Sequence, residues 1–134
     1  PDSVASRIHV AAVSMEDREV NATVVNAVQR VSSVVTQRSL IEAFGLTVAE
    51  AMWKKAPVVA SAVGGIRDQI DDGVDGVLVN PTDGLAWAEA VRDLLLFPER
   101  AQEMGLVAHE SVRREFLSNR HLQDLLQIVA DLVG

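Results

Sequence analysis

The chain has 134 residues, of which 49% are hydrophobic, 23% charged and 4% aromatic, and its formal net charge is −7 at pH 7. This length suits one domain with a real core, the apolar content excludes a disordered chain, and no apolar run reaches the ~18 residues that a membrane helix needs. The negative charge disfavours nucleic-acid binding, and the absence of cysteine excludes disulfides and thiolate metal sites, so we expect a cytoplasmic protein that binds neither nucleic acid nor membrane.

Short valine-rich runs predict the strands. Each run is bounded by turn or charged residues and is apolar almost throughout, which is typical of parallel strands that are covered on both faces. The predicted strands span residues 7–13, 34–37, 57–61 and 76–79.

Helical patterns fill the intervals between the strands and continue after the last one. The predicted helices span residues 21–31, 46–55, 85–96, 98–112 and a tail capped by Ser118 or Asn119, with at most a short helix over 66–70. Alternation of strands and helices predicts a parallel sheet with right-handed crossovers. The fold class is therefore α/β, as one domain over residues 1–134 that ends in a helical tail. The apolar stripe of that tail predicts a core or domain-interface surface; it consists of Leu122, Leu125, Leu126 and Val129.

The segment over residues 42–52 holds the candidate site. It follows the 34–37 strand, at the edge where an open parallel sheet presents its ligand crevices. A helix begins at residues 44–47, and its first N–H groups and positive dipole end make an anion site. Gly45 would let a phosphate approach the main chain there. Glu42 lies just before this helix, and Glu50 lies inside it, eight positions later.

Glu50 stands in an unusually apolar helix. An acid in such a setting must be paired or hydrogen-bonded, because burying an unsatisfied carboxylate costs several kcal/mol. Sugar or ribose hydroxyls are suitable partners. The alternative is that Glu50 faces water or pairs with Lys54 at i+4.

Four motifs in a fixed order carry a resemblance to a known family. They are Glu42-x7-Glu50 around Phe44-Gly45-Leu46-Thr47, then Pro57-Val58-Val59-Ala60, then Gly64-Gly65-Ile66, then Asp72-Gly73-x-x-Gly76-x-Leu78-Val79. Together they resemble the donor-binding, C-terminal domain of the retaining GT-B glycosyltransferases of the glycogen-synthase and sucrose-synthase group. Residues 50–54 and 61–66 are most similar to the trehalose synthase (glycosyltransferring) branch. The resemblance covers the chain from about Arg7 to the last helix.

The resemblance implies transfer of a hexose, glucose in this branch, from a nucleoside diphosphate to an acceptor sugar with retained configuration. It gives Glu42 the catalytic position beside the donor sugar and Glu50 the nucleotide ribose. No metal or other cofactor is implied, because the helix dipole and basic side chains neutralise the leaving diphosphate. The other implied substrate-binding residues are Phe44, Gly45, Leu46 and Thr47 at the diphosphate and sugar, and Gly64 and Gly65 in a loop near the cleft.

The sequence departs from the family pattern in ways that bear on activity. Ala43 stands where the family often has glycine, and the Arg and Lys that clamp the diphosphate, the first two βα units and the acceptor domain have no counterpart. We therefore expect part of a glycosyltransferase that is inactive alone. The two absent strands would lie between the 7–13 and 34–37 strands. Strand edges left open by these absences invite pairing with another strand. We therefore expect either a rearranged sheet or a covered edge. The cover would be the missing N-terminal half or a second copy of the chain, which would make a homodimer.

Two other classes of protein stay open at this point. A non-catalytic nucleotide-sugar-binding or assembly module would keep the fold without the chemistry. A sugar-phosphate isomerase or epimerase would share the fold but leave the glutamate spacing without a purpose. His9, His109 and His121 are too far apart in the sequence to predict a metal triad.

Overall fold

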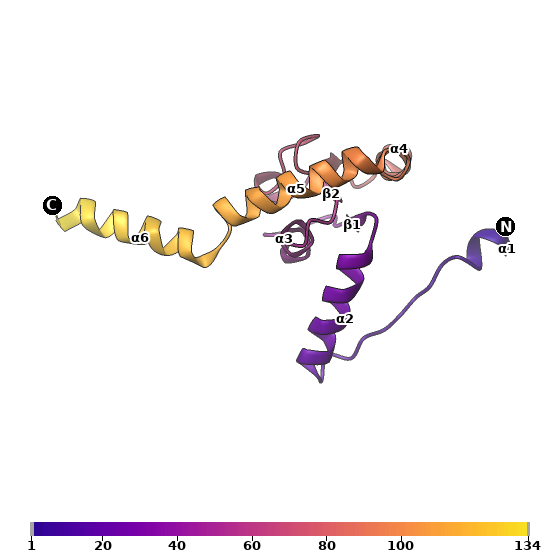
Figure 1. Ribbon diagram of the computed structural model, residues 1–134, viewed down its shortest axis with the longest axis horizontal. Coiled ribbons are helices and arrows are strands. Elements are labelled where there is room, and N and C mark those ends of the chain that lie inside the picture. The colour runs from indigo at the N-terminus through magenta and orange to yellow at the C-terminus, as the bar shows by residue number, and fades with distance from the viewer. Residues whose placement is uncertain (1, 134) are drawn as a thin grey trace.

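The computed structural model describes residues 2–133, except for the side chains of Asp2, Ser118, Asn119 and His121. Helices surround a small sheet, and the last helix extends away from the body (Figure 1). The elements in chain order are α1 (Asp2–Ala5), α2 (Arg18–Val31), β1 (Val35–Gln37), α3 (Leu46–Trp53), β2 (Val58–Ser61), the 3-10 helix η1 (Gly64–Asp68), β3 (Val77–Val79), α4 (Gly84–Leu96), α5 (Pro98–Glu115) and α6 (Ser118–Val133).

The sheet is parallel, in the order β1-β2-β3. Val35 lies opposite Val58, and Val59 lies opposite Val77. Three of the four predicted strands are thus confirmed to within a residue at either end. Every residue of the central strand β2 is buried, which explains why its sequence is apolar without alternation.

Two groups of helices cover the two faces of the sheet. Successive side chains of a strand point to opposite faces, so Val58 and Ala60 pack with α3 while Val59 packs with α4. Helix α5 serves both clusters: Met104 packs on the α4 side and Ala108 on the α3 side. One long helix therefore joins the two layers.

The strand predicted over residues 7–13 is wrong. This segment has no regular structure, and Ile8 and Val10 are 63% and 93% exposed. It leads from α1 to α2 away from the sheet (Figure 1). The physical reason is that a strand needs a neighbouring edge to pair with, and β propensity without that partner is weak. The rearranged sheet that would join this segment to β1 is not found.

The two outer strands differ in how their edges are covered. On β3, the carboxylate of Asp72 accepts a hydrogen bond of 2.8 Å from the N–H of Leu78. On β1, the N–H of Val35 donates toward β2, to Pro57 O at 2.8 Å, so the alternation of the strand turns the backbone groups of Thr36 outward. Within residues 2–133 no strand pairs with that side of β1. The β1 edge is open.

Helix α2 begins at a cap and turns its apolar face away from the body. The carboxylate of Asp17 accepts from the N–H groups of Glu19 and Val20, which fixes the start at Arg18, three residues before the predicted one. Only Gln29 of this helix is buried. The exposed apolar side chains form what we call the valine stripe: Val20, Val24, Val28 and Val31.

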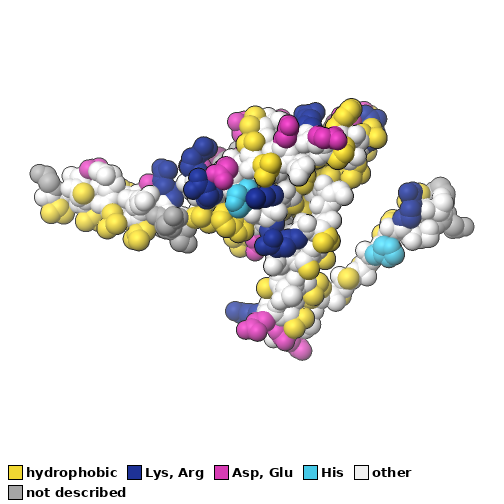
Figure 2. Space-filling view, viewed as in Figure 1, with side chains coloured by type: hydrophobic (Ala, Val, Ile, Leu, Met, Phe, Trp, Pro, Cys, Tyr) yellow, Lys and Arg dark blue, Asp and Glu magenta, His cyan; other side chains and the backbone are white. Residues whose placement is uncertain are grey.

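Helix α6 forms as predicted, but its apolar stripe packs against nothing in the described chain. Leu122, Leu125, Leu126 and Val129 are all exposed. Figure 2 shows hydrophobic side chains in a row along one face of this helix. They are thus not part of the core. Of the two roles predicted for this stripe, a core surface or a domain-interface surface, only the second remains. No helix within residues 2–133 combines the length and the apolar character that crossing a bilayer requires.

Candidate functional site

The candidate site lies at the carboxyl edge of the sheet, where the loop after β1 meets the loop after β2. These loops approach each other through their backbones. A Cβ on Gly64 would lie 1.8 Å from the carbonyl oxygen of Glu42, and a Cβ on Gly65 would lie 2.2 Å from that of Ala43. The N–H of Gly65 also donates to Glu42 O at 3.3 Å. The two glycines therefore fix where the loop of Glu42 sits.

The Glu42 carboxylate is held in a short chain of hydrogen bonds. Gln37, at the end of β1, donates to the hydroxyl of Ser39 at 2.8 Å, and that hydroxyl donates to Glu42 Oε2 at 3.2 Å. Glu42 is half-buried. Its other oxygen has no partner among the described residues. The carboxylate is thus oriented by the strand end and keeps an acceptor free.

Gly45 starts helix α3 in the left-handed conformation, with φ at 81°. A Cβ there would lie 2.9 Å from Ile66 Cγ1, so packing against η1 also requires a glycine. The carbonyl of Gly45 accepts from the N–H groups of Val48 and Ala49. The N–H groups of Leu46 and Thr47 find no acceptor in the described chain, as the first turn of a helix leaves them. The two N–H groups on which the predicted anion site depends are therefore free, and anion binding itself stays a prediction.

Glu50 is exposed, so it faces water, as the first part of the alternative interpretation states, and it has no hydrogen-bond or ion-pair partner among the described residues. The pairing with Lys54 does not form, because the Lys54 ammonium donates instead to Gln29 Oε1 on α2. Glu50 lines two cavities. One, of about 380 Å³, lies between α2 and α3 and is lined by Asn21, Ala22, Val25, Asn26, Glu50 and Lys54.

The second cavity at Glu50 is more apolar and has a volume of about 230 Å³. Phe44 and Leu46 line it, together with Val112 of α5 and the two residues that follow this helix, Phe116 and Leu117. The ring of Phe44 meets that of Phe116 edge-on, with centroids 6.0 Å apart. Neither cavity includes Glu42. The structure thus brings Glu50 together with Phe44 and Leu46, and Glu42 together with the glycines, but does not bring the two carboxylates into one cavity.

Two residues that the sequence did not single out organise this region. Buried Gln29 connects α2 to α3: its Nε2 donates to Thr47 O at 3.4 Å, and its Oε1 accepts from Lys54. Arg38 connects the loops after β1 and β3, because its Nε donates to Pro81 O at 3.0 Å and its guanidinium lies 5.6 Å from the centroid of a Trp87 ring. Gln29 could have been noticed as a long polar residue on the face of α2 opposite the valines.

Two further polar side chains are buried near the site without partners. They are Ser61, at the carboxyl end of β2, and Gln69, just after η1. The amide oxygen of Gln69 would lie 3.2 Å from a Cβ on Gly45, so this amide lies beside the start of α3. Sequence patterns do not reveal such groups, because the absence of a partner is a property of the packed structure.

Two of the three histidines have described side chains, and they lie in different parts of the chain. His9 is exposed in the segment before α2, and His109 on α5 stacks on Trp53, with centroids 4.5 Å apart. The His121 side chain lies outside the described part. Residues 2–133 hold no group of three histidine or carboxylate side chains placed to bind a metal ion.

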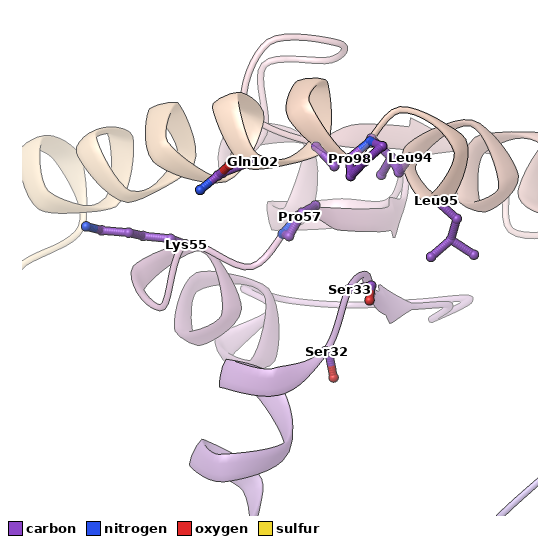
Figure 3. Close-up of a pocket in the computed structure, with 9 residues that line it drawn as sticks. Ser32, Ser33, Lys55, Pro57, Leu94, Leu95, Pro98 and Gln102 are labelled. Atoms are coloured by element: carbon purple, nitrogen blue, oxygen red, sulfur yellow. The ribbon is translucent and has the colours of Figure 1, made fainter.

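A cavity of about 290 Å³ lies at the opposite, amino edge of the sheet (Figure 3). Ser33 and Pro57 line it, and these residues precede β1 and β2. Lys55, Leu94 and Pro98 complete much of the wall. Because it lies at the amino ends of the strands, this cavity is separate from the candidate site.

Comparison with known proteins gives the family. Residues 18–110 match the family model of glycosyl transferases group 1. The trehalose synthase of Pyrococcus horikoshii is 49% identical over 115 residues, which are 86% of this chain and 27% of that protein. The chain thus spans about a quarter of the length of this relative.

Solved structures show the same fold. Sucrose-phosphate synthase from Thermosynechococcus elongatus matches with a TM-score of 0.73 and 31% identity over 92% of this chain and 29% of that one. Anabaena HepE, solved in complex with UDP-glucose, matches with a TM-score of 0.70 and 21% identity over 79% of this chain and 30% of that one. These matches confirm the predicted α/β class and the likeness to the GT-B glycosyltransferases. This chain belongs to the family of glycosyl transferases group 1.

Proposed function

We propose that this chain is the donor-binding part of a retaining glycosyltransferase that transfers a hexose, glucose in a trehalose synthase-like reaction, from a nucleoside diphosphate to an acceptor sugar. One observation carries the proposal. Glu50 is a carboxylate without a protein partner in a groove that Asn21 and Asn26 also line, and the Lys54 ammonium of the same groove is hydrogen-bonded to Gln29 instead of to Glu50. A carboxylate in this state accepts hydrogen bonds from the hydroxyl groups of a ribose. The similarity to a protein solved with UDP-glucose supports a uridine nucleotide as the first donor to test.

The remaining site residues take roles that follow from their chemistry. The free N–H groups of Leu46 and Thr47, at the positive end of the α3 dipole, would stabilise the negative charge that develops on the leaving diphosphate. The free oxygen of Glu42 would accept from donor-sugar hydroxyls near the reacting carbon. We propose that Phe44, Gly64 and Gly65 act by holding these two segments in place. No metal or other cofactor is needed in this scheme.

We propose that the chain completes its site with protein that lies outside the sequence. The chain spans 27% of the trehalose synthase that it resembles, and the clamp cations of the family have no counterpart among its residues. The open β1 edge and the valine stripe are surfaces that the remainder of such an enzyme, or a second copy of this chain, would cover. We expect the isolated chain to bind donor without turning it over. Release of nucleoside diphosphate from a nucleotide-glucose by the purified chain would contradict this.

Calorimetric titration with UDP-, ADP- and GDP-glucose tests the proposal. We expect binding of one donor and a loss of about 1–3 kcal/mol in the Glu50→Ala variant, because charge-assisted hydrogen bonds to the ribose disappear. The matched control is Glu103→Ala, which removes an exposed carboxylate of α5 far along the chain from the site. Equal affinity in the Glu50→Ala variant and the control would exclude the ribose role.

The alternative function is a non-catalytic module that binds a nucleotide sugar or assembles with a partner. The exposed α6 stripe favours it, because an unpartnered apolar helix is a docking surface. The two functions differ in whether adding the missing N-terminal half produces a transferase. Sugar transfer by such a reconstituted pair would favour the enzyme.

A further inference from the structure

The groove between α2 and α3 has a wall on the α2 side to which the proposed function assigns no role. Its α2 side consists of Asn21, Ala22, Val25 and Asn26, and the last three follow one another at helical spacing with Gln29. At about 100° per residue, this face lies opposite the valine stripe. The helix therefore presents an amide to α3, directly across the groove that Glu50 also lines.

The orientation of the Asn26 amide follows from its neighbour. Arg30 Nε donates to Asn26 Oδ1 at 3.0 Å, one turn along the same helix. A guanidinium can only donate, so the atom that it meets must be the oxygen. The Nδ2 group of Asn26 is then the free end of the amide, and it has no acceptor among the described residues. In contrast, Nδ2 of Asn21 is already bound to Ser14 O at 3.2 Å.

A second contact, between Gln29 and Lys54, leaves the Glu50 carboxylate on the opposite wall of the groove free to accept hydrogen bonds. Gln29 holds the Lys54 ammonium, and Gln29 is itself buried and tied to the Thr47 carbonyl. Lys54 lines the same groove but forms no ion pair with Glu50. The groove of about 380 Å³ thus has an unpaired acceptor on α3 and, on α2, a donor whose amide Arg30 orients.

We propose that this groove is a diol subsite in which Asn26 Nδ2 donates to a ribose hydroxyl oxygen while Glu50 accepts from the hydroxyl protons. A hydroxyl group both donates and accepts hydrogen bonds. Two vicinal hydroxyls therefore match a groove that has a donor on one wall and an acceptor on the other. Asn26 is then a specificity residue for the ribose of the nucleotide. Arg30 is a positioning residue, because its hydrogen bond to Oδ1 turns the Nδ2 group of Asn26 toward the groove. The inference rests on the proposed function, since it deepens the role of the same site.

The test compares UDP with 2′-deoxy-UDP by calorimetry on the 134-residue chain. The wild type should bind UDP more tightly than the deoxy compound. Asn26→Asp keeps the shape and the contact with Arg30 but cannot donate, and Asn26→Ala removes the amide without adding charge. Both should lose about 3–10-fold in UDP affinity, the value of one hydrogen bond, and should discriminate less between the two nucleotides.

Two further variants separate positioning from folding. Arg30→Ala leaves the Asn26 side chain in place but releases its amide, so we expect a smaller preference for UDP over 2′-deoxy-UDP. Gln102→Ala, which removes an exposed amide of α5, should leave both affinities unchanged. Circular dichroism confirms that each variant keeps its helices.

The outcomes distinguish this inference from the function on which it rests. If Glu50→Ala weakens UDP binding while both Asn26 variants keep wild-type affinity and preference, the diol subsite is wrong and the proposed function stands. If the wild-type chain binds neither UDP nor UDP-glucose at millimolar concentration, the proposed donor-binding function fails, and the inference fails with it.

Discussion

Lys55 adopts a backbone conformation that an L-residue with a side chain rarely takes, with φ at 63°. It follows the last turn of α3, where its N–H donates to Met52 O at 2.9 Å and the N–H of Ala56 donates to Ala51 O at 3.1 Å. These two bonds are those of a Schellman motif, whose left-handed position is usually a glycine. The chain thus ends the site-bearing helix sharply at the cost of some strain at one residue.

We predict that Lys55→Gly stabilises the chain by about 0.5–1 kcal/mol, because glycine adopts positive φ without a Cβ penalty. Urea denaturation followed by circular dichroism measures the change. The control is Lys55→Ala, which loses the same charge but keeps the Cβ. The control is needed because removing the charge of Lys55 can itself change the stability. The pKa of Glu110 lies below its usual value, chiefly through a hydrogen bond from Arg113 and partly through the charge of Lys55, so the two charged groups interact. A gain of the same size in both variants would mean that backbone strain is not the cause.

At the scale of elements, the contact of α3 with α5 determines how the site-bearing helix is held. Gly105 lies in the middle of α5, where a Cβ would come within 2.2 Å of the Lys55 carbonyl oxygen. His109, one turn later, donates from Nδ1 to Trp53 O at 2.6 Å. The end of α3 is therefore fastened to α5 by a close backbone approach and a side-chain cap.

We predict that Gly105→Ala destabilises the chain by about 1–3 kcal/mol, the usual cost of forcing atoms into a packed contact. Helix propensity alone would predict a gain of up to about 1 kcal/mol. The two effects have opposite signs, so chemical denaturation decides between them.

Gly84→Ala is the matched control for this substitution. Gly84 is the first residue of α4, and a Cβ added there would have an Arg38 nitrogen as its nearest neighbour, at 4.0 Å. We expect this variant to be neutral or slightly more stable. If Gly105→Ala behaved like Gly84→Ala, the close approach of α5 to Lys55 would be wrong.

At the scale of the whole molecule, the described chain has a well-formed core and two apolar surfaces without partners. The core is formed by β2, α3, α4 and α5. The valine stripe of α2 and the apolar stripe of α6 (Leu122, Leu125, Leu126 and Val129) are exposed. Because an amphipathic helix gains its stability from burying its apolar face, these two helices depend on a surface outside the described chain.

We predict that the double substitution Val24→Glu and Val28→Glu changes the free energy of unfolding by less than about 0.5 kcal/mol, as exposed positions usually do. These side chains are 38% and 56% exposed. Light scattering should show less self-association than in the wild type, because the stripe is the surface that another chain would cover. The control is Val59→Glu in the core of β2, which should unfold the chain. A loss of several kcal/mol in the double variant would show that the stripe is buried within the chain.

Local sequence was sufficient for most of the helices and for three strands. The cap at Asp83, the apolar period and the positions of glycine and proline all act within a few residues, so they can be interpreted without a fold; the cap at Asp17 was missed, and α2 therefore begins three residues before its predicted start. The same holds for the start of α3 at Gly45, where the helix terminus leaves unpaired the N–H groups that the sequence predicts as an anion site. The roles given to Glu42 and Glu50 stay predictions until donor binding is measured.

What the sequence determined by itself, then, is the alternation of strands and helices, the family motifs and the place of the candidate site at the carboxyl edge of the sheet. Only the tertiary structure decided that residues 7–13 stay unpaired, that α2 turns its valines outward and that Lys54 binds Gln29 instead of Glu50. The physical reason is common to all three. A strand needs an edge, a helix face needs a surface, and the partner of a charged side chain depends on which groups the packing brings beside it; each of these is supplied by residues far away in the chain.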